Sequence, residues 1–251
     1  MTDGIVIQAR SGSTRMPAKI LLPFCGSETI LDIIIEKIKR SCPDLPVIAA
    51  TTENFSDDRI AEVARAHGVG CFRGSEDDVL SRFIGAADEF GLDRLIRVCS
   101  DNPFLQTDSF PALFAAADVN PGADYVAFAF PGGRPTIKSH LGLYAELATT
   151  DALRRAAAAT QEKLYREHVT IYLYTHPGEF TSVYMPLPPA LRDRTDLRLT
   201  LDTPSDFALL QELYSRLGAE TDTSLPSLLQ LVDSNPDYGR IMKQNIAQNE
   251  K

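Results

Sequence analysis

The chain has 251 residues, of which 44% are hydrophobic and 24% are charged, and its formal net charge at pH 7 is −9. This acidity disfavours nucleic acids and anionic membranes as partners, and no apolar run approaches the ~18 residues that a membrane-spanning helix needs. The N-terminus lacks the basic and apolar regions of a signal peptide, and the cysteines and histidines show no zinc-type spacing, so we expect a cytoplasmic protein with free thiols.

The first half of the chain alternates apolar runs typical of strands with segments of helical periodicity. Strands are expected at residues 5–9, 47–51, 94–99 and 125–128. Helices are expected between them, over residues 30–38, 57–67 and 77–90, and a glycine follows each of the last two. Because strands that alternate with helices form parallel sheets, the pattern predicts an α/β fold with a mostly parallel sheet.

The second half predicts further helices at residues 150–159, 163–175, 205–217 and 225–232, and strands near 180–185 and 197–201. The proline-rich segments between them are typical of loops rather than of domain linkers. We therefore expect a single domain over residues 1–245, which is a suitable length for one α/β domain, and a polar, frayed tail at 246–251.

The most informative segment lies at the start of the chain, where the first strand runs into a loop of small and cationic residues. The small residues are Ser11, Gly12, Ser13 and Thr14, and the cations are Arg10, Arg15 and Lys19. Small residues let backbone N–H groups approach an oxyanion closely, and the cations add charge, so the loop predicts a triphosphate site. Its spacing fits neither the Walker loop nor the dinucleotide fingerprint. A solvated basic loop without a ligand is the alternative.

Three more polar segments follow expected strands, at residues 72–78, 100–104 and 199–204. Ligands of open α/β sheets bind beyond the carboxyl ends of the strands, so these segments and the first loop could meet at one edge. Asp101 and Asp202 follow two of the strands, and carboxylates beside a polyphosphate imply Mg²⁺ between them. The alternatives are turn formation or capping by these acids, and an ordinary N-cap by Ser75.

A second cationic group lies later in the chain. It consists of Lys138, His140, Arg166 and His168. These side chains suit an anionic second substrate, whereas a lone histidine is more often a structural residue whose hydrogen bonds are satisfied.

Four motifs, taken in order, resemble those of a known family. They are QARSGSTRMPAK at residues 8–19, FRGSEDDVL at 72–80, REHVT at 166–170 and LDTP at 201–204. Over residues 4–210 the chain resembles the cytidylyltransferases related to spore coat polysaccharide biosynthesis protein F, which are relatives of the acylneuraminate and 3-deoxy-manno-octulosonate cytidylyltransferases. The resemblance implies a Rossmann-like nucleotidyltransferase fold of the glycosyltransferase-A type, with helices on both faces of the sheet. It also implies Mg²⁺-dependent transfer of CMP from CTP to a sugar acid, with release of pyrophosphate, for surface polysaccharide biosynthesis.

The resemblance further implies roles for individual residues. The nucleotide would be bound by Ala9, Arg10, Ser11, Gly12, Ser13, Arg15, Lys19, Arg73, Gly74, Ser75 and Asp77. The catalytic residues would be Arg15, Lys19, Asp101 and Asp202, and the two aspartates would hold the metal. The acceptor would be bound by Lys138, His140, Arg166 and His168. A subregion at about residues 130–195 would carry both the acceptor site and the contacts of a homodimer.

Two positions depart from the family pattern. Ala18 stands where many relatives have glycine, so the loop must differ locally if that position needs a positive φ. Residues 135–144 look more like the His-Ile-Gly-Ile-Tyr segment of the octulosonate enzymes than like the spore-coat relatives. A nucleotide-sugar-dependent glycosyltransferase is one alternative, although residues 100–102 lack the Asp-x-Asp motif typical of that class. A non-catalytic nucleotide-binding protein is the other.

Overall fold

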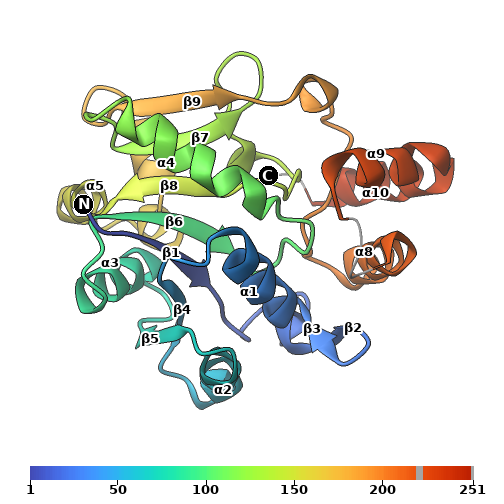
Figure 1. Ribbon diagram of the computed structural model, residues 1–251, viewed down its shortest axis with the longest axis horizontal. Helices are drawn as coiled ribbons and strands as arrows, with labels where there is room; N and C mark the ends of the chain where they lie inside the picture. The colour runs from blue at the N-terminus through green and yellow to red at the C-terminus, as the bar shows by residue number, and fades with distance from the viewer. Residues whose placement is uncertain (219–222, 250–251) are drawn as a thin grey trace.

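A seven-stranded sheet forms the centre of the molecule in the computed structural model, which describes residues 1–218 and 223–249 (Figure 1). Across the sheet the strands lie in the order β5, β4, β1, β6, β8, β7, β9. Their bounds are β1 Asp3–Gln8, β4 Val47–Thr52, β5 Gly70–Gly74, β6 Arg94–Cys99, β7 Tyr125–Ala129, β8 Glu146–Thr149 and β9 Ser182–Pro186. A separate short hairpin consists of β2 Pro23–Cys25 and β3 Glu28–Thr29.

Every strand of the large sheet except β8 runs in the same direction. β1 pairs in parallel with β4 and β6, β4 with β5, and β7 with β9, whereas β8 is antiparallel to both β6 and β7. The carboxyl ends of β1, β6 and β7 therefore meet at one edge, where the loops that follow them can form one site. The predicted mostly parallel sheet is confirmed.

Helices cover both faces of the sheet, as expected. Their bounds are α1 Ile30–Ser41, α2 Asp58–Ala66, α3 Val79–Glu89, α4 Phe110–Asp118, α5 Thr150–Ala159, α6 Lys163–Glu167, α7 Ile171–Thr175, α8 Pro204–Leu217, α9 Leu225–Ser234 and α10 Pro236–Gln248. Short 3-10 helices include η1 Lys19–Leu21 and η4 Thr136–Lys138.

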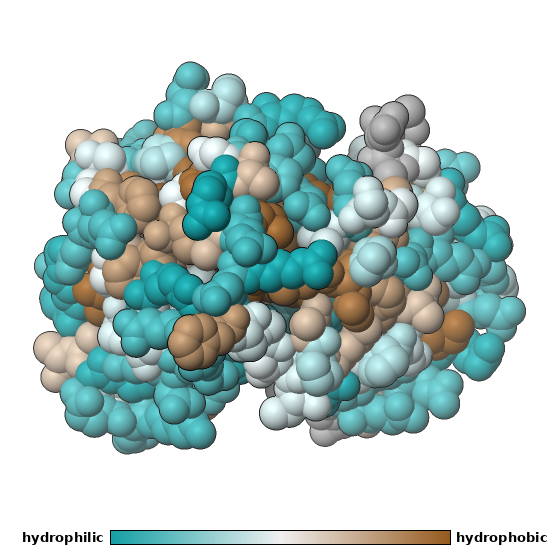
Figure 2. Space-filling view, turned by 90° about the horizontal axis from the view of Figure 1, so that it is seen from below, coloured by the Kyte–Doolittle hydropathy of each residue, from teal (hydrophilic) through white to brown (hydrophobic). Residues whose placement is uncertain are grey.

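The helices bury two apolar cores, one on each face of the sheet. α1, α2 and α4 contribute to one core, and α3, α5 and α7 contribute to the other. α8, α9 and α10 extend the first core and form a group at one side of the molecule (Figure 1). The surface seen in Figure 2 is mostly hydrophilic, with smaller apolar areas between the polar side chains. Within the described part of the chain, no helix has both the length and the apolar character needed to cross a membrane.

The strand predicted at residues 197–201 is wrong. This segment is buried but lies outside the sheet. The Leu199 N–H donates to the His140 carbonyl and the Leu201 N–H donates to the Asp101 carbonyl, each at 2.9 Å. These isolated bonds fasten the segment to two loops instead of to a strand, and they bring Asp202 close to Asp101.

The helix predicted over residues 163–175 is interrupted between α6 and α7, at residues 168–170. Val169 is fully buried in the core, and the Thr170 hydroxyl donates to the buried carboxylate of Glu146. Because both side chains point into the protein, the chain turns at this place, and His168 comes to line the pocket described below.

The frayed tail predicted from residue 246 is also wrong in part. Residues 246–248 form the last turn of α10, because Asn245 is buried and donates hydrogen bonds to Ser205 and Asp206 of α8. Asn249 accepts a hydrogen bond from Arg15 at 2.9 Å. Residues 250 and 251 lie outside the described residues.

Candidate functional site

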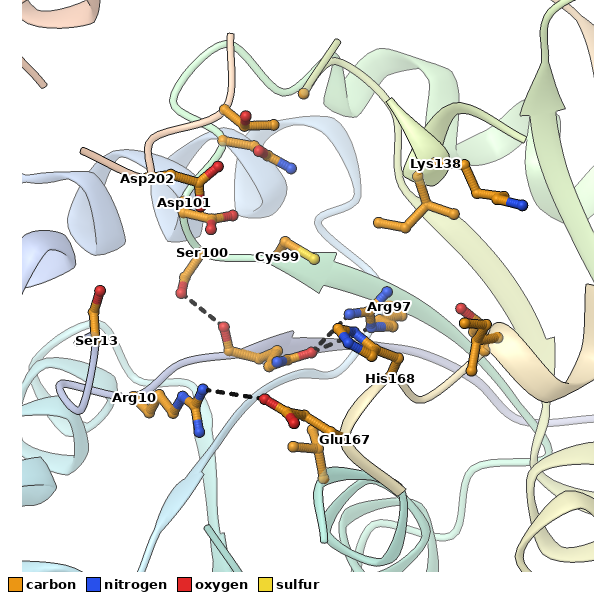
Figure 3. Close-up of a pocket in the computed structure, with 18 of the residues that line it drawn as sticks. Arg10, Ser13, Arg97, Cys99, Ser100, Asp101, Lys138, Glu167, His168 and Asp202 are labelled. Carbon is orange, nitrogen blue, oxygen red and sulfur yellow. Dashed lines mark hydrogen bonds and ion pairs between the residues drawn. The ribbon is translucent and has the colours of Figure 1, made fainter. Parts of the chain in front are cut away.

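A pocket of about 680 Å³ opens at the carboxyl ends of β1, β6 and β7 (Figure 3). Its volume lies in the range of roughly 300–1,000 Å³ that small-molecule sites occupy. Residues from the segments 10–20, 99–102 and 136–144 line it, and residues from the segment 164–174 close the other side. All four motifs found in the sequence thus contribute residues to one pocket, although the motif at 72–80 contributes only Val79.

A buried carboxylate anchors the loop that follows β1. Asp57, which is 1% exposed, accepts hydrogen bonds from the Ser11 backbone N–H at 2.8 Å and from the Ser11 hydroxyl at 2.5 Å. The hydroxyls of Thr51 and Thr52, at the end of β4, donate to the other carboxylate oxygen. Ser11 is therefore a loop anchor. Its N–H is engaged within the protein, which corrects the phosphate-binding role predicted for it.

Acid is expected to release this anchor. Burial raises the pKa of Asp57, but hydrogen bonds from Ser11 and Thr52 outweigh it and hold the pKa below its ordinary value of 3.8. Such a carboxylate stabilises the folded state above the unfolded pKa, and this stabilisation is lost as the pH falls through the lower folded pKa. We expect Asp57→Asn to lose about 2 kcal/mol of unfolding free energy at neutral pH.

The variant should also lose less stability than the wild type on acidification below about pH 4. Urea unfolding of both proteins at neutral and acidic pH measures this difference. Equal sensitivity to acid would contradict the role given to Asp57.

Ala18 closes the same loop in a left-handed conformation, with φ 53° and ψ 21°. Among the residues that the structure describes, it is the one non-glycine residue with a positive φ. Its N–H donates to the Ser11 carbonyl at 2.8 Å, and its carbonyl accepts from the Leu21 N–H at 2.8 Å. The position thus has the conformation that favours glycine, and the loop keeps it with alanine instead of changing locally.

Ala18→Gly is expected to leave the fold intact and to stabilise it by up to about 1 kcal/mol. Glycine removes the ~1–2 kcal/mol that an L-residue costs in the left-handed region, although the freer unfolded chain offsets about 0.4–1 kcal/mol of this gain. The melting temperature should rise by at most a few degrees, on the order of 2–4 °C per kcal/mol for a chain of this size. The β-branched variant Ala18→Val should melt lower than the wild type. A glycine variant that melts well below the wild type would contradict the left-handed assignment.

Two aspartates and two cations converge where the loop after β1 meets the turn after β6. Nζ of Lys19 lies 3.1 Å from Oδ2 of Asp101 and 3.8 Å from Oδ1 of Asp202. It also donates to the Leu201 carbonyl. Nη2 of Arg15 lies 3.1 Å from Oδ1 of Asp202. The structure therefore brings together the four residues predicted as catalytic, and Asp101 and Asp202 lie next to each other in Figure 3.

The chemistry of these donors fits a hard divalent cation. Asp101 and Asp202 offer carboxylate oxygens at one end of the pocket. Mg²⁺ usually takes one or two carboxylates and completes its shell with water and substrate phosphate oxygens. Within residues 1–218 and 223–249, no three acidic, histidine or cysteine side chains gather into a metal site of their own. A cation held here would therefore need oxygens from a substrate or from water.

Three of the other residues predicted to bind the nucleotide line the pocket. They are Arg10, Gly12 and Ser13. Arg10 forms an ion pair of 3.8 Å with Glu167, which also lines the pocket and to which the motif at 166–170 assigned no role (Figure 3). A phosphate that enters the loop would compete with Glu167 for this guanidinium.

Five other residues predicted to bind the nucleotide are not part of the pocket lining. They are Ala9, Arg73, Gly74, Ser75 and Asp77. Arg73 pairs with Asp58 at 2.6 Å and donates to the Thr52 carbonyl, so its guanidinium is engaged within the protein. Glycine at position 74 is explained by packing, because a Cβ there would lie 3.0 Å from the Phe72 ring.

Two of the four residues predicted to face the acceptor line the pocket. Lys138, from η4, lies across the pocket from Arg10 and Ser13 (Figure 3). His168 lies on the opposite wall from the phosphate loop, at the turn between α6 and α7. Both remain suitably placed for an anionic ligand.

The other two point into the protein, which corrects their predicted contact with the acceptor. His140 is buried, and its Nδ1 accepts a hydrogen bond of 2.5 Å from Nη1 of Arg198. Arg166 pairs with Asp78 at 3.2 Å and donates to backbone carbonyls in the segment 157–160. The sequence shows the charge of these residues but not the partners that occupy them.

A buried network beneath the pocket includes residues that the sequence pattern did not single out. Arg97 of β6 pairs with Glu146 of β8 at 2.8 Å and donates to Oε1 of Gln8 at 2.9 Å. Glu146 also accepts hydrogen bonds from the hydroxyls of Tyr125 and Thr170. An arginine inside an apolar strand is the signal that could have revealed the network, because a buried guanidinium needs a buried carboxylate.

Comparison with known proteins agrees with this architecture. The family model described as cytidylyltransferase matches residues 5–231. The chain is 36% identical over 243 residues to an uncharacterized protein of Methanocaldococcus jannaschii, covering 97% of this chain and 95% of that protein. It is 31% identical over 237 residues to the spore coat polysaccharide biosynthesis protein SpsF of Bacillus subtilis, covering 92% and 94%.

Among solved structures, a cytidylyltransferase from Leptospira borgpetersenii is similar with a TM-score of 0.83 and 31% identity, over 97% of each chain. The family match and these two kinds of relative each extend over most of the chain. They include the loop after β1 and the two aspartates that meet beside it. This chain therefore belongs to the cytidylyltransferase family of nucleotidyltransferases.

Proposed function

We propose that this protein transfers CMP from CTP to an anionic acceptor, a sugar acid of the nonulosonic or octulosonic type, and releases pyrophosphate in a reaction that requires Mg²⁺. The observation that carries the proposal is the convergence of two cations and two carboxylates at one end of the pocket. They are Arg15, Lys19, Asp101 and Asp202. Cations that bind a polyphosphate, next to carboxylates that bind a metal, suit a metal–nucleotide complex.

In the structure these charges neutralise one another. Lys19 lies between Asp101 and Asp202, and Arg15 pairs with Asp202. A triphosphate would take over the two cations, and the carboxylate oxygens released would face the pocket. When bound there, Mg²⁺ would act as a Lewis acid on the α-phosphate. Because each charge keeps an opposite partner before and after binding, the exchange avoids leaving a buried charge unpaired.

The reaction would proceed by in-line attack of an acceptor oxygen on the α-phosphorus of CTP. A bond forms between the acceptor oxygen and the α-phosphorus while the bond to the bridging oxygen of the β-phosphate breaks. Pyrophosphate leaves with that electron pair, and the acceptor proton passes to solvent. Arg15 and Lys19 would stabilise the charge that grows on the pyrophosphate, and most of the catalysis would come from positioning and charge stabilisation.

The acceptor would lie on the side of the pocket formed by η4 and the turn at His168. Within the described residues Lys138 forms no ion pair, so its ammonium is available to a carboxylate of the acceptor. Arg97 also lines the pocket, but its charge is already balanced by the ion pair with Glu146. A role in surface polysaccharide biosynthesis is supported by the name of the Bacillus subtilis relative. Because cells hold CTP in the cytoplasm, we expect the protein to act there.

A homodimer formed through residues 130–195 is part of the same proposal. β9, in that range, is the edge strand of the sheet, and its Tyr184 is an exposed aromatic side chain. Light scattering during size-exclusion chromatography measures the mass in solution. A monomeric mass would exclude the dimer without affecting the catalytic proposal.

A thermal-shift titration with CTP, UTP, GTP and ATP, each with and without Mg²⁺, tests which nucleotide the protein binds. A ligand at 100 times its Kd adds about 2.7 kcal/mol to stability, which shifts the melting temperature measurably. We expect stabilisation by CTP that Mg²⁺ enhances and that the other nucleotides do not reproduce. Stabilisation by another nucleotide instead of CTP, or by none of them, would contradict the proposal. If CTP stabilises the protein, pyrophosphate release with a panel of sugar acids would identify the acceptor.

A further inference from the structure

We propose that Arg198 is a positioning residue for Asp202: it holds one carboxylate oxygen inside the protein and leaves the other one to the pocket. The inference rests on the proposed function, because it concerns how Asp202 is presented to a divalent cation and a nucleotide. It assigns a role to a residue that is not part of the pocket lining.

Arg198 uses all three of its guanidinium nitrogens within the protein. Nε and Nη2 bind the two carboxylate oxygens of Asp206 at 2.7 and 2.8 Å, which is the bidentate geometry that arginine favours. Nη1 donates to Nδ1 of His140 at 2.5 Å, and Nη2 also donates to Oδ2 of Asp202 at 3.1 Å. The side chain is fully buried. A guanidinium held by three partners without access to water cannot swing away to meet a ligand.

The two oxygens of Asp202 consequently face different surroundings. Oδ2 points to Arg198, whereas Oδ1 lies near Arg15 and Lys19. Arg15, one of the two cations at Oδ1, has a side chain that is 53% exposed, and Lys19, the other one, is 11% exposed and lines the pocket, so both can contact a ligand there. The Arg198 side chain at Oδ2 is 0% exposed and does not line the pocket. When a triphosphate draws Arg15 and Lys19 away, Oδ1 becomes available and Oδ2 stays bound. Asp202 would therefore offer a single oxygen to a cation.

The partner of Arg198 is itself firmly held. Asp206 accepts hydrogen bonds from the backbone N–H groups of Asp202 and Thr203 at 3.0 and 2.9 Å, as part of the capping box that starts α8. Asn245 of α10 donates to it at 2.9 Å. Asp206 thus fixes both the backbone and the side chain of Asp202, the latter through Arg198. Such support for a binding residue preorganises the site.

Lysine cannot replace arginine in this arrangement. Its ammonium retains the positive charge but lacks the planar fork that binds Asp206 with two nitrogens and still reaches Asp202. Arg198→Lys should therefore keep the buried charge compensated and lose the contact with Oδ2. The chain offers a matched control in Arg194, which pairs with Asp196 at 2.9 Å and binds both oxygens of Asp233, but does not line the pocket or contact Asp202.

The experiment measures binding of Mn²⁺ in the presence of saturating CTP, by electron paramagnetic resonance of the free ion, for the wild type, Arg198→Lys, Arg194→Lys and Asp202→Asn. No acceptor is needed. We expect Arg198→Lys to weaken Mn²⁺ binding at least tenfold, Arg194→Lys to change it less than twofold, and both to retain a cooperative melting transition. Mn²⁺ affinity within twofold of the wild type in folded Arg198→Lys would overturn the inference.

A second variant covers the case in which Arg198→Lys does not fold. The double variant Arg198→Gln with Asp206→Asn replaces the buried ion pair with a neutral pair, so no buried charge is left uncompensated. It should show the same loss of Mn²⁺ affinity, and wild-type affinity would again overturn the inference. Failure of the proposed function would give a different pattern. If the wild type binds no Mn²⁺ in the presence of CTP, or if Asp202→Asn binds it normally, the proposed metal site is refuted, and this inference is refuted with it.

Discussion

Replacement of Asp202 with asparagine is expected to slow pyrophosphate release by about 10²-fold or more while the protein keeps its fold. Asparagine has almost the same shape and can still accept a hydrogen bond from Arg198, so the start of α8 should remain intact. The variant loses the negative charge that pairs with three cations and that, in the proposed complex, binds a divalent metal. The site would then hold Arg15, Lys19 and Arg198 around a neutral side chain.

The measurement is the rate of pyrophosphate release from CTP with the acceptor identified by screening, together with a melting curve for each variant. Asp233→Asn is the matched control, because Asp233 also pairs with an arginine but lies away from the pocket. The control should retain wild-type activity. Near wild-type activity of Asp202→Asn in a folded protein would remove Asp202 from the proposed metal site.

The sheet could be predicted from the sequence because its central strands are buried on both faces. Such strands appear as nearly continuous apolar runs, and the run at residues 94–99, which two ion-paired arginines interrupt, matches the bounds of β6. The same rule failed for β8, a strand of four residues that starts at the buried Glu146. A carboxylate at the first position of so short a strand hides the apolar pattern, and only its partner Arg97 on β6 explains why it can be buried.

The chemistry at the strand ends could be predicted for a similar reason. Residues that follow parallel strands directly must meet at one edge, which is how Lys19, Asp101 and the loop after β1 came to be placed together. Asp202 reaches the same place for a different reason, since the segment before it is not a strand and two isolated backbone hydrogen bonds hold it there. Its position was correct although the element assigned to it was wrong.

What the sequence could not show is which polar side chains are already occupied. Ser11, His140 and Arg166 have the residue types that bind anions, yet each is bound by a partner between 46 and 88 positions away along the chain. Local patterns carry no information about such pairings. The residues that remain available to a ligand were identified only when the tertiary contacts of their neighbours were known.

Lys19→Ala is expected to slow pyrophosphate release by about 10²–10³-fold, because the variant loses a charge that would stabilise the departing pyrophosphate. Its effect on metal binding should be opposite to that of Asp202→Asn. The Lys19 ammonium lies within 4 Å of both carboxylates, so it competes with any divalent cation for the same oxygens. Without it, two like charges face each other and gain more from a bound cation.

Mn²⁺ affinity in the presence of CTP should therefore stay the same or rise in Lys19→Ala, while it falls in Asp202→Asn. Lys39→Ala, which removes a half-exposed lysine paired with Glu36 on α1, controls for the general loss of a positive charge and should change neither rate nor affinity. Unchanged kinetics in Lys19→Ala would refute the phosphate role of the loop. A parallel loss of rate and of metal affinity would instead show that Lys19 supports the aspartates, since the two functions separate only if the lysine binds the nucleotide and the acids bind the metal.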